Sequence, residues 1–342
     1  MSLDLPLIWA GVIAIAVLLY VLLDGFDLGI GILFPFARDA KHRDAMMESI
    51  APIWDGNETW LVLGGGGLLA AFPLAYSILM PAFYIPVYLM LLALILRGVA
   101  LEFRLRGRKR GKAFWTAAFA GGSLTAAFAQ GLVLGGFVQG VRMHGLAFAG
   151  GPLDWLTGYS IVTAIGVVAG YALLGAGWLM VKTEGDLHQD ARWWAAVAAV
   201  AVALLLASVS LLTLFLHPFI ARRWGWNGHG FDMAVFAPLS TIPLLGLAGL
   251  ALVAWGLRVN SHRLPLLGGY LVFLSGYIGL AYAFFPYAVP YDVTYRQAAS
   301  ADNALALMLV GVAILLPVIL GYTVWVYHLF RGKVGADGGY HA

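Results

Sequence analysis

Long apolar runs dominate this chain and decide what it can fold into. A helix that crosses a membrane needs about 20 mostly apolar residues. Of the 342 residues, 62% are hydrophobic and only 11% are charged, whereas a soluble domain carries about 25% charged residues. We predict an all-α polytopic membrane protein, with residues 1–342 as one integral membrane domain and a retained first helix. Nine runs qualify as spans: 7–36, 51–74, 77–104, 113–136, 156–181, 193–217, 234–257, 264–285 and 304–330.

Lysine and arginine residues predict how these nine helices are oriented, because they favour cytoplasmic loops. With the N-terminus outside, fifteen of them lie in inner loops or the tail, four lie in outer loops, and Arg97 lies inside a span. We therefore predict an outer N-terminus and a cytoplasmic C-terminus. We interpret the densest basic group, 104–112, as an anchor that touches anionic lipid. A nucleic-acid partner is not expected, because no aromatic platform accompanies this group.

Cysteine and histidine usage limits the cofactors that this chain could hold. There is no cysteine, which excludes disulfides, thiolate-ligated haem and cysteine-ligated iron–sulfur clusters. A b-type haem needs an axial histidine. The eight histidines lie in loops, in the tail or at span ends, and only His217 has a position compatible with a lone ligand. We expect no redox centre and no metal ion in this chain.

Six ionisable residues lie within or at the ends of the first three spans. An ionisable group inside a spanning helix is costly, so it is by default a functional-site hypothesis. Members of the group that are three residues apart on one helix share a helix face, and short loops make the three helices neighbours. The predicted orientation brings all six to the inner side of the membrane: Asp24, Asp27, Asp55, Glu58, Arg97 and Glu102.

Proton uptake is the physical use that such a group of acids suggests. Carboxyl groups in a low-dielectric setting can hold and pass protons near neutral pH, while the neighbouring Arg97 keeps selected ones ionised. Groups perturbed in this way concentrate at functional sites. The sequence therefore predicts that these acids handle protons or ions.

Structural interpretations of the same residues remain open. The segment 55–58 fits a capping box, in which one acid caps the helix and a second follows three residues later. An acid of the segment 24–27 would pair with Arg97 as a bridge within the bundle. Glu102 would pair at the membrane surface with an arginine of the segment 104–106.

The segment 54–60, WDGNETW, resembles subunit II of the cytochrome bd-type quinol oxidases. The stretch 58–69 is most similar to the cyanide-insensitive branch of that family. The matches extend over nearly the whole chain in family order. They comprise 24–29 (DGFDLG), 49–52 (SIAP), the glycine run 64–67, 71–73 (AFP), 97–104 (RGVALEFR), 139–140 (QG), 185–188 (GDLH), 285–286 (FP) and Pro290.

This resemblance implies a fold and a complex. Members of the family have nine transmembrane helices, arranged as two four-helix bundles plus one peripheral helix. They pair with a larger subunit I, which carries two b haems, one d haem and the site that oxidises quinol, and the complex reduces dioxygen to water with cytoplasmic protons. The resemblance thus implies a haem-free subunit II in the bacterial cytoplasmic (inner) membrane that stabilises subunit I and contributes to proton uptake. A small single-helix subunit is a further partner that it leaves open.

The resemblance also implies roles for individual residues. Acids at the subunit interface are implicated in proton intake in the family, and the matching positions here are Asp55 and Glu102. Glu102 stands where the family pattern often has Asp, so its reach is longer. Trp54 and Arg97 match positions close to a structural quinone that some members hold.

A proton-coupled secondary transporter is the alternative function. Such a transporter also carries acids in its spans, but it places them near the midplane beside broken helices. In this chain the charges gather near one face. A self-contained b-type cytochrome is disfavoured because paired histidines are lacking.

Overall fold

The computed structural model describes residues 3–106, 111–334 and 340–341, and nearly all of them that lie in regular structure are helical. Within this part, eight helical segments are long and apolar enough to cross a membrane. The predicted all-helical polytopic membrane fold is therefore confirmed. The helices in these segments are α1 (Leu5–Leu33), α4 (Pro73–Arg106), α5 (Lys112–Gln139), α6 (Gly158–Lys182), α7 (Gly185–Leu216), α9 (Met233–Leu239) with α10 (Thr241–Arg258), α11 (Leu264–Phe284) and α13 (Asp302–Leu329).

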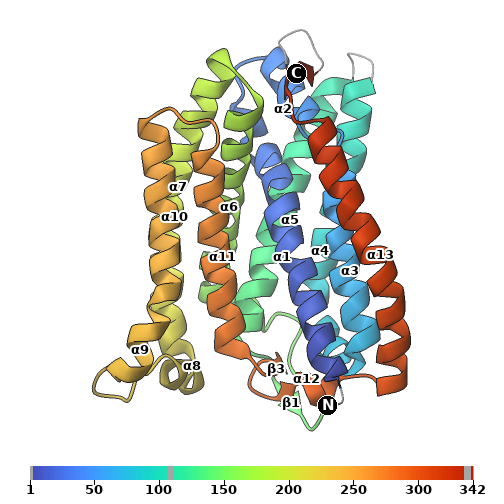
Figure 1. Ribbon diagram of the computed structural model, residues 1–342, viewed down its shortest axis with the longest axis vertical. Helices are drawn as coiled ribbons and strands as arrows, with labels where there is room; N and C mark the ends of the chain where they lie inside the picture. The colour runs from blue at the N-terminus through green and yellow to red at the C-terminus, as the bar shows by residue number, and fades with distance from the viewer. Residues whose placement is uncertain (1–2, 107–110, 335–339, 342) are drawn as a thin grey trace.

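The remaining predicted run, 51–74, forms the shorter helix α3 (Trp54–Ala71). Its polar opening, with Asp55, Asn57 and Glu58, lowers its hydropathy, and it is not among the eight segments. It nevertheless runs alongside α1 and α4 within the bundle (Figure 1).

We name two groups of helices in chain order. The first helix group comprises α1, α3, α4 and α5, and the second comprises α6, α7, α10 and α11, with α1 and α5 lying against α6. Helix α13 packs beside α1 on the outer edge of the first group (Figure 1). Short connections make sequential helices antiparallel neighbours, which is why most partners are adjacent in sequence.

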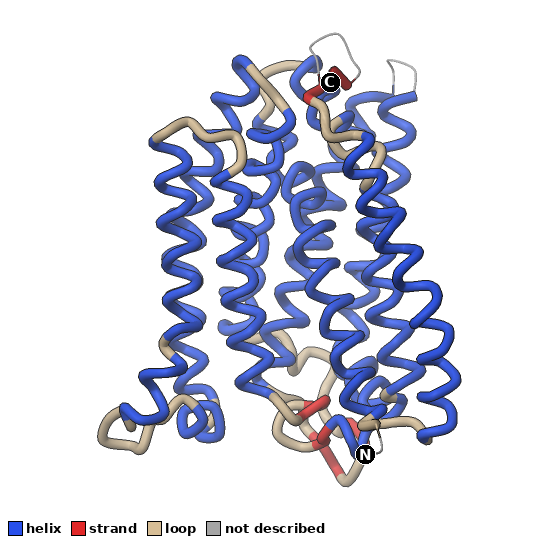
Figure 2. Tube along the Cα trace, in the orientation of Figure 1, coloured by secondary structure: helices blue, strands red, loops and turns tan. Residues whose placement is uncertain are grey.

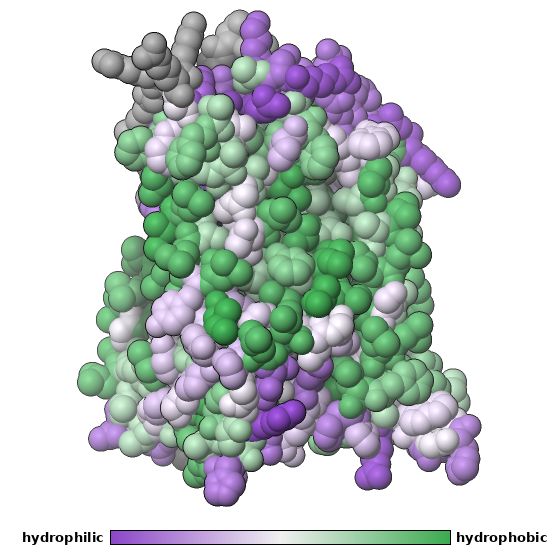
Figure 3. Space-filling model, turned by 180° about the vertical axis from the view of Figure 1, so that it is seen from behind, coloured by the Kyte–Doolittle hydropathy of each residue, from purple (hydrophilic) through white to green (hydrophobic). Residues whose placement is uncertain are grey.

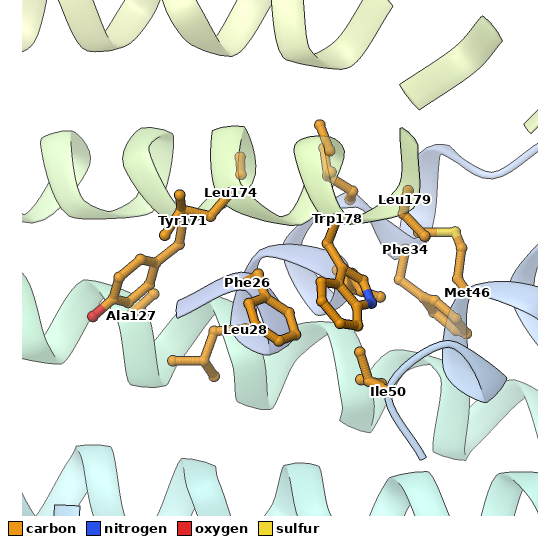
Figure 4. Packing of buried hydrophobic residues seen from close by; sticks show 14 of the residues in the cluster. Phe26, Leu28, Phe34, Met46, Ile50, Ala127, Tyr171, Leu174, Trp178 and Leu179 are labelled. Atoms are coloured by element: carbon orange, nitrogen blue, oxygen red, sulfur yellow. The ribbon is translucent and has the colours of Figure 1, made fainter. Parts of the chain in front are cut away.

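Small residues let the two groups approach closely. A Cβ atom added at Gly29 of α1 would lie 1.8 Å from the carbonyl oxygen of Tyr171 in α6, and one added at Gly175 would lie 2.4 Å from Gly29. Such contacts are typical of membrane helices, whose packing depends on van der Waals contact. Figure 4 shows the aromatic core beside this crossing, where Phe26 stacks on Trp178 with ring centres 4.2 Å apart.

One end of the molecule, called the α8 end, carries most of the loop structure (Figures 1 and 2). Three connections at this end hold short strands or short helices. The elements at this end are β1 (Met143–His144), β2 (Ala147–Phe148), α8 (Pro218–Arg223), β3 (Tyr287–Val289), β4 (Val293–Thr294) and α12 (Tyr295–Ala298).

The opposite end, called the α2 end, carries η1 (Phe34–Phe36), α2 (Ala40–Glu48), β5 (Lys333–Val334) and β6 (Tyr340–His341). The two chain termini lie at opposite ends of the molecule (Figure 1). An apolar band crosses the surface between polar ends (Figure 3). The predicted basic anchor 104–112 lies partly outside the described residues, which exclude 107–110.

Two prolines lie inside α4. The helix begins at Pro73 and continues through Pro81 and Pro86. Proline removes a backbone donor and its ring clashes with the preceding turn. The helix accommodates this with a kink, since Phe83 has non-helical angles of φ −118° and ψ 18°.

Candidate functional site

A buried arginine lies at the centre of the candidate site. Arg97 of α4 is only 1% exposed. Its Nη1 donates to Oδ1 of Asp24 in α1 at 2.7 Å, and its Nη2 donates to Oε2 of Glu58 in α3 at 3.2 Å. Charge-assisted bonds of this kind are stronger than neutral ones. Three helices of the first group are thus joined by one side chain.

A second set of bonds lies beside this arginine. The amide of Asn57 donates from Nδ2 to Oδ2 of Asp27 at 2.8 Å, and its Oδ1 accepts from the Tyr327 hydroxyl at 2.8 Å. Asp27 is on α1 and Tyr327 is on α13, so Asn57 connects the first helix group to the peripheral helix. We call the residues Asp24, Asp27, Asn57, Glu58 and Arg97 the ionic cluster.

Helix geometry explains why these side chains meet. Asp24 and Asp27 are three residues apart and share a face of α1. They lie about 9–14 Å before the end of α1 at Leu33, at 1.5 Å per residue. Arg97 lies a similar distance before the end of α4 at Arg106, and Glu58 lies in the second turn of α3. All three helices therefore place their ionisable residues toward the α2 end.

The ionic cluster has three acids but only one positively charged side chain, and some of its carboxylate oxygens lack hydrogen-bond partners within the described residues. Asp24 and Asp27 are both 0% exposed, yet Oδ2 of Asp24 and Oδ1 of Asp27 have no hydrogen-bond partner in the described part of the chain. Three carboxyl groups share one guanidinium, so the cluster is neutral only when two of them are protonated. A buried carboxyl group without a cation is costly in its ionised form.

A chain of neutral hydrogen bonds lies one turn deeper. The Tyr171 hydroxyl donates to Oε1 of Gln130 at 2.7 Å, and Nε2 of Gln130 donates to the Tyr20 hydroxyl at 2.6 Å. Tyr20 precedes Asp24 by four residues on α1, so the two share a helix face. This chain extends the polar interior from the ionic cluster toward the second helix group.

Trp54 covers the Arg97 side of the cluster. The Arg97 guanidinium lies 5.7 Å from the centre of the Trp54 ring, within the range of a cation–π interaction. The same ring fits against Gly98, where an added Cβ would lie 3.0 Å from it. Arg97 is buried and bonded to carboxylates, whereas Trp54 is partly exposed. Trp54 is therefore the more accessible of the two residues predicted to lie near a quinone.

The predicted acids do not all come together. The pairing of Asp24 with Arg97 was one of the open alternatives, and it is present. Asp55 is exposed, whereas Glu58 is turned toward Arg97. The shared face predicted for this pair does not place both in the cluster. The buried residues of α3, Asn57 and Trp60 among them, lie on the side of the helix opposite Asp55. Glu102 is partly buried, one turn nearer the helix end than Arg97.

The predicted capping box at 55–58 is wrong. The N-cap of α3 is Ile53, and no side chain caps the helix. The acid at position 55 is the second residue of the helix instead. The capping pattern is local, and the preceding turn at 50–53 makes the helix start two residues earlier than that pattern predicts.

The basic residue after Glu102 has a different partner from the one considered. Arg104 donates from Nη1 to Oδ1 of Asp44 at 2.5 Å and from Nε to the Thr116 hydroxyl at 2.9 Å. It thereby fixes α2 against α4 and α5. The Arg106 side chain lies outside the described residues.

Histidines have structural contacts. His217 accepts from the backbone N–H of Phe219 and stacks on Tyr291 with ring centres 4.0 Å apart. His188 and His262 both approach the Met180 carbonyl, at 3.1 and 2.9 Å. Among the residues that the structure describes, no group of three or more His, Cys, Asp or Glu side chains could hold a metal ion. The absence of haem from this chain stays a prediction.

Outside the spans, exposed ion pairs join the loops at the α2 end. Arg38 donates to Asp190 at 2.5 Å, and Lys333 donates to Glu184 at 2.6 Å. The hydrogen bond from Lys333 lowers the pKa of the Glu184 carboxyl below its usual value. These bonds connect the segment after α1 and the segment after α13 to the start of α7.

Sequence reasoning missed two members of this site. Asn57 lies inside the motif at 54–60 but is neutral, so a search for ionisable residues passed over it. Tyr327 is 270 residues from Asn57 in the chain, and a tyrosine near a span end is normally interpreted as an interface residue. Gln139, which had no assigned role, donates to the Thr157 hydroxyl and so connects α5 to the start of α6.

Comparison with protein families identifies the class of this membrane protein. The family model for "Cytochrome bd terminal oxidase subunit II" matches residues 5–330. The chain therefore belongs to the cytochrome bd terminal oxidase subunit II family. This confirms the resemblance based on 54–60 and the other motifs.

Individual relatives agree over nearly their full length. "Cytochrome bd ubiquinol oxidase subunit 2" of Bacillus subtilis is 27% identical over 346 residues, covering 96% of this chain and 96% of the relative. "Cytochrome bd-I ubiquinol oxidase subunit 2" of Escherichia coli is 26% identical over 369 residues, covering 96% and 95%. A chain in the structure of bd oxidase from Geobacillus thermodenitrificans has the same fold, with a TM-score of 0.68 at 18% identity over 97% of this chain and 100% of that chain.

The chain is therefore a subunit of a bd-type oxidase, an enzyme complex, as the sequence predicted. The similarity of 58–69 to the cyanide-insensitive branch stays a prediction. The roles of individual residues also stay predictions, because the family match concerns the whole chain.

Proposed function

We propose that this chain is the haem-free subunit II of a quinol-oxidising, dioxygen-reducing complex, and that it supplies part of the path for protons. Its relatives are named ubiquinol oxidase subunits, and membership of the family implies a subunit I as partner. In the complex, subunit I would carry the b and d haems and the quinol site. This chain would stabilise subunit I and deliver protons toward the reaction.

The proposed membrane arrangement has nine spans. Helix α3 would be the ninth, since it runs beside α1 and α4. The two helix groups and α13 would then form two four-helix bundles plus one peripheral helix. The opposite positions of the termini support an odd number of crossings (Figure 1). The excess of basic residues supports an α2 end in the cytoplasm. The chain would then lie in the inner membrane of a bacterial cell.

The ionic cluster is the observation that carries the proposed proton role. It holds three acids for one cation, and two buried carboxylate oxygens lack partners among the described residues. Neutrality requires that two of the acids be protonated, so the cluster would hold protons that it can pass on as others replace them. Arg97 would keep one carboxylate ionised and so leave the others as carriers.

The exposure of the acids suggests an order along the path. Asp55 is exposed, the Glu58 side chain is 26% exposed, and Asp24 and Asp27 are fully buried. Protons would enter from the α2 end at Asp55 and Glu102, and pass by way of Glu58 to the buried pair. The neutral donor Asn57 would orient Asp27.

A structural quinone is a second part of the proposal. The partly exposed ring of Trp54 offers a flat surface for the quinone headgroup. Arg97 would hold that ring in place through its cation–π contact. The quinone would then fix the first helix group without taking part in turnover.

The proton-coupled transporter is less well supported than the oxidase subunit. Family membership favours the oxidase, and the buried acids lie toward the α2 end rather than at a midplane break. Solute uptake by vesicles that contain this chain alone would favour the transporter.

The test is Asp27→Asn in the assembled complex. The change keeps the shape and an acceptor for Asn57 but removes the proton carrier. We expect quinol oxidase turnover to fall roughly 10- to 100-fold, as for loss of an acid–base group. The haem spectrum of the co-purified partner should be unchanged. Asp302→Asn, at an exposed acid on α13, is the matched control and should keep full turnover.

Two outcomes would overturn the proton role. One is full turnover of the Asp27→Asn complex with normal haem content. The other is loss of haem and partner in step with loss of activity, which would make the residue structural. Asp55→Asn should slow turnover less than Asp27→Asn, because an exposed position can be bypassed by water.

A further inference from the structure

A cavity lies at the corner where α7 ends and α8 begins. Figure 1 shows this corner at the α8 end of the molecule. Its volume is about 510 Å³. Two consecutive arginines contribute all of the formal positive charge in its lining. The lining residues are His217, Pro218, Phe219, Arg222 and Arg223.

The positive charge of this cavity is not balanced by the protein. Within the described residues, neither Arg222 nor Arg223 forms an ion pair with a carboxylate. Nε of Arg223 is buried without a hydrogen-bond partner there. A buried donor without an acceptor is costly, so this atom indicates that an anion completes the site.

Arg223 is already held in place for such a contact. Its guanidinium lies 4.9 Å from the ring centre of Tyr282 and 5.7 Å from that of Phe219. The Tyr282 hydroxyl donates to the backbone carbonyl of Arg223 at 3.2 Å. A planar guanidinium stacked on rings keeps its N–H edge available for oxygen acceptors. These contacts would therefore hold the Arg223 side chain in place before a ligand binds.

The position of the cavity relative to the membrane indicates that the anion is a lipid headgroup. An exposed apolar stripe runs along α7 from Trp193 through Val200, Leu204 and Leu211 to Phe215. These 22 residue steps span about 33 Å at 1.5 Å per residue, close to the hydrocarbon thickness of about 30 Å. The cavity begins two residues later at His217, so it lies at the headgroup level of the leaflet at the α8 end.

We propose that this corner binds a phospholipid, with its phosphate between Arg222 and Arg223 and its acyl chains along the exposed stripe of α7. Guanidinium groups donate paired N–H bonds to phosphate oxygens. The stripe supplies an apolar surface that lipid chains can cover. The bound lipid would fix α8 and the end of α7 at the edge of the second helix group. This site is separate from the ionic cluster and does not depend on the proposed proton path.

The test uses the complex purified with its partner subunit in mild detergent and titrated with phosphatidylglycerol. Native mass spectrometry counts bound lipid. We expect one tightly held lipid per complex, and the double change Arg222→Gln with Arg223→Gln should weaken it at least about tenfold, because two charge-assisted contacts are lost. Arg142→Gln is the matched control at the same end, since Arg142 is exposed and pairs with Asp154 at 3.6 Å. It should leave the count unchanged.

Other results would overturn the proposal. An unchanged lipid count in the double variant means that the arginines do not hold it, and an equal loss with Arg142→Gln means a general charge effect. Displacement of the lipid by millimolar inorganic phosphate would identify the cavity as a site for free phosphate instead. If the glutamine variant does not assemble, the pair Arg222→Lys with Arg223→Lys decides the question. It keeps the charge but loses the fork, so its lipid affinity should be intermediate, and wild-type affinity would count against the site.

Discussion

The two helix groups differ in what they bury. The first group buries Asp24, Asp27 and Arg97 at or below 1% exposure. Arg97 bonds Asp24 and Asn57 bonds Asp27, each across two helices. In the second group, buried hydroxyls bond to backbone carbonyls: Thr163 donates to Tyr159 and Ser275 donates to Ile242. The buried ionisable residues of the second group, Lys182 and His188, also contact backbone carbonyls. The first group therefore joins buried polar side chains to one another, whereas these side chains of the second group bond to the backbone. The contrast predicts different consequences for mutations in each.

Removing the central cation should have the largest effect. Arg97→Leu leaves Asp24 and Glu58 without their partner, and breaking a buried ion pair in this way costs about 3–5 kcal/mol. We expect a large loss of assembled complex, measured as the amount of partner subunit that co-purifies. Arg97→Lys is the control, because it keeps a positive charge and should retain part of the yield. A normal yield for Arg97→Leu would show that assembly does not depend on the buried ion pairs of the first helix group.

The next largest effect is expected from adding a side chain where the two helix groups touch. In Gly29→Val, the new side chain meets the Tyr171 carbonyl, only 1.8 Å from its Cβ, so α1 and α6 must separate. Overpacking typically costs about 1–3 kcal/mol, and a clash with backbone belongs at the upper end. A lower melting temperature and a loss of monodisperse protein are expected.

Gly11→Val is the matched control for that change. It lies on the same helix, and an added Cβ there has nothing within 4 Å. If both variants melt at the same temperature, the close approach of the groups does not contribute to stability.

Removing the amide of Asn57, which joins Asp27 to Tyr327, should have a smaller effect. Asn57→Leu leaves the Tyr327 hydroxyl and one Asp27 oxygen unpaired, which costs about 1–2 kcal/mol. We expect a modest fall in melting temperature together with slower turnover. Thr59→Ala, two residues away on an exposed part of the helix, serves as control. Turnover equal to wild type would separate Asn57 from the proton path.

The smallest effect is expected at the α2 end, in Lys333→Gln. Because Lys333 holds the pKa of Glu184 below its usual value, the pair stabilises the fold above the unfolded-state pKa of Glu184. That contribution disappears as the pH falls through the folded-state pKa. The variant should melt slightly earlier than wild type at neutral pH and together with it in acid. A difference that grows in acid would have the wrong sign for this pair.

The sequence predicted the helical framework well because it depends on hydrophobic length. Runs such as 113–136 and 264–285 lie within a few residues of α5 and α11. Prediction was poorer where helix ends are polar, as at α7, which begins at Gly185 rather than at 193. There the helix continues beyond the apolar run.

The sequence indicated which charged residues belong to the site, but not which of them face the interior of the bundle. A bridge between Arg97 and an acid of the segment 24–27 was one of the open alternatives, because a buried charge needs an opposite one. The exposure of Asp55 was not predictable, since spacing fixes the angle between two residues but not which of them faces the bundle. The bond from Tyr327 joins elements that share no local pattern. Such contacts require the tertiary structure.

The bond between Asn57 and Tyr327 also constrains biosynthesis. Its partners are separated by 270 residues, so at 5–20 residues per second the ribosome needs roughly 14–54 seconds to make the second after the first. During that time α1 has already been made, and Asp27 lacks its final surroundings. Helix α13 is the element that completes them. A nascent chain stopped before α13 would therefore present a distinctive polar surface to the insertion and quality-control machinery, so a finished chain and an arrested one can be told apart within the bilayer.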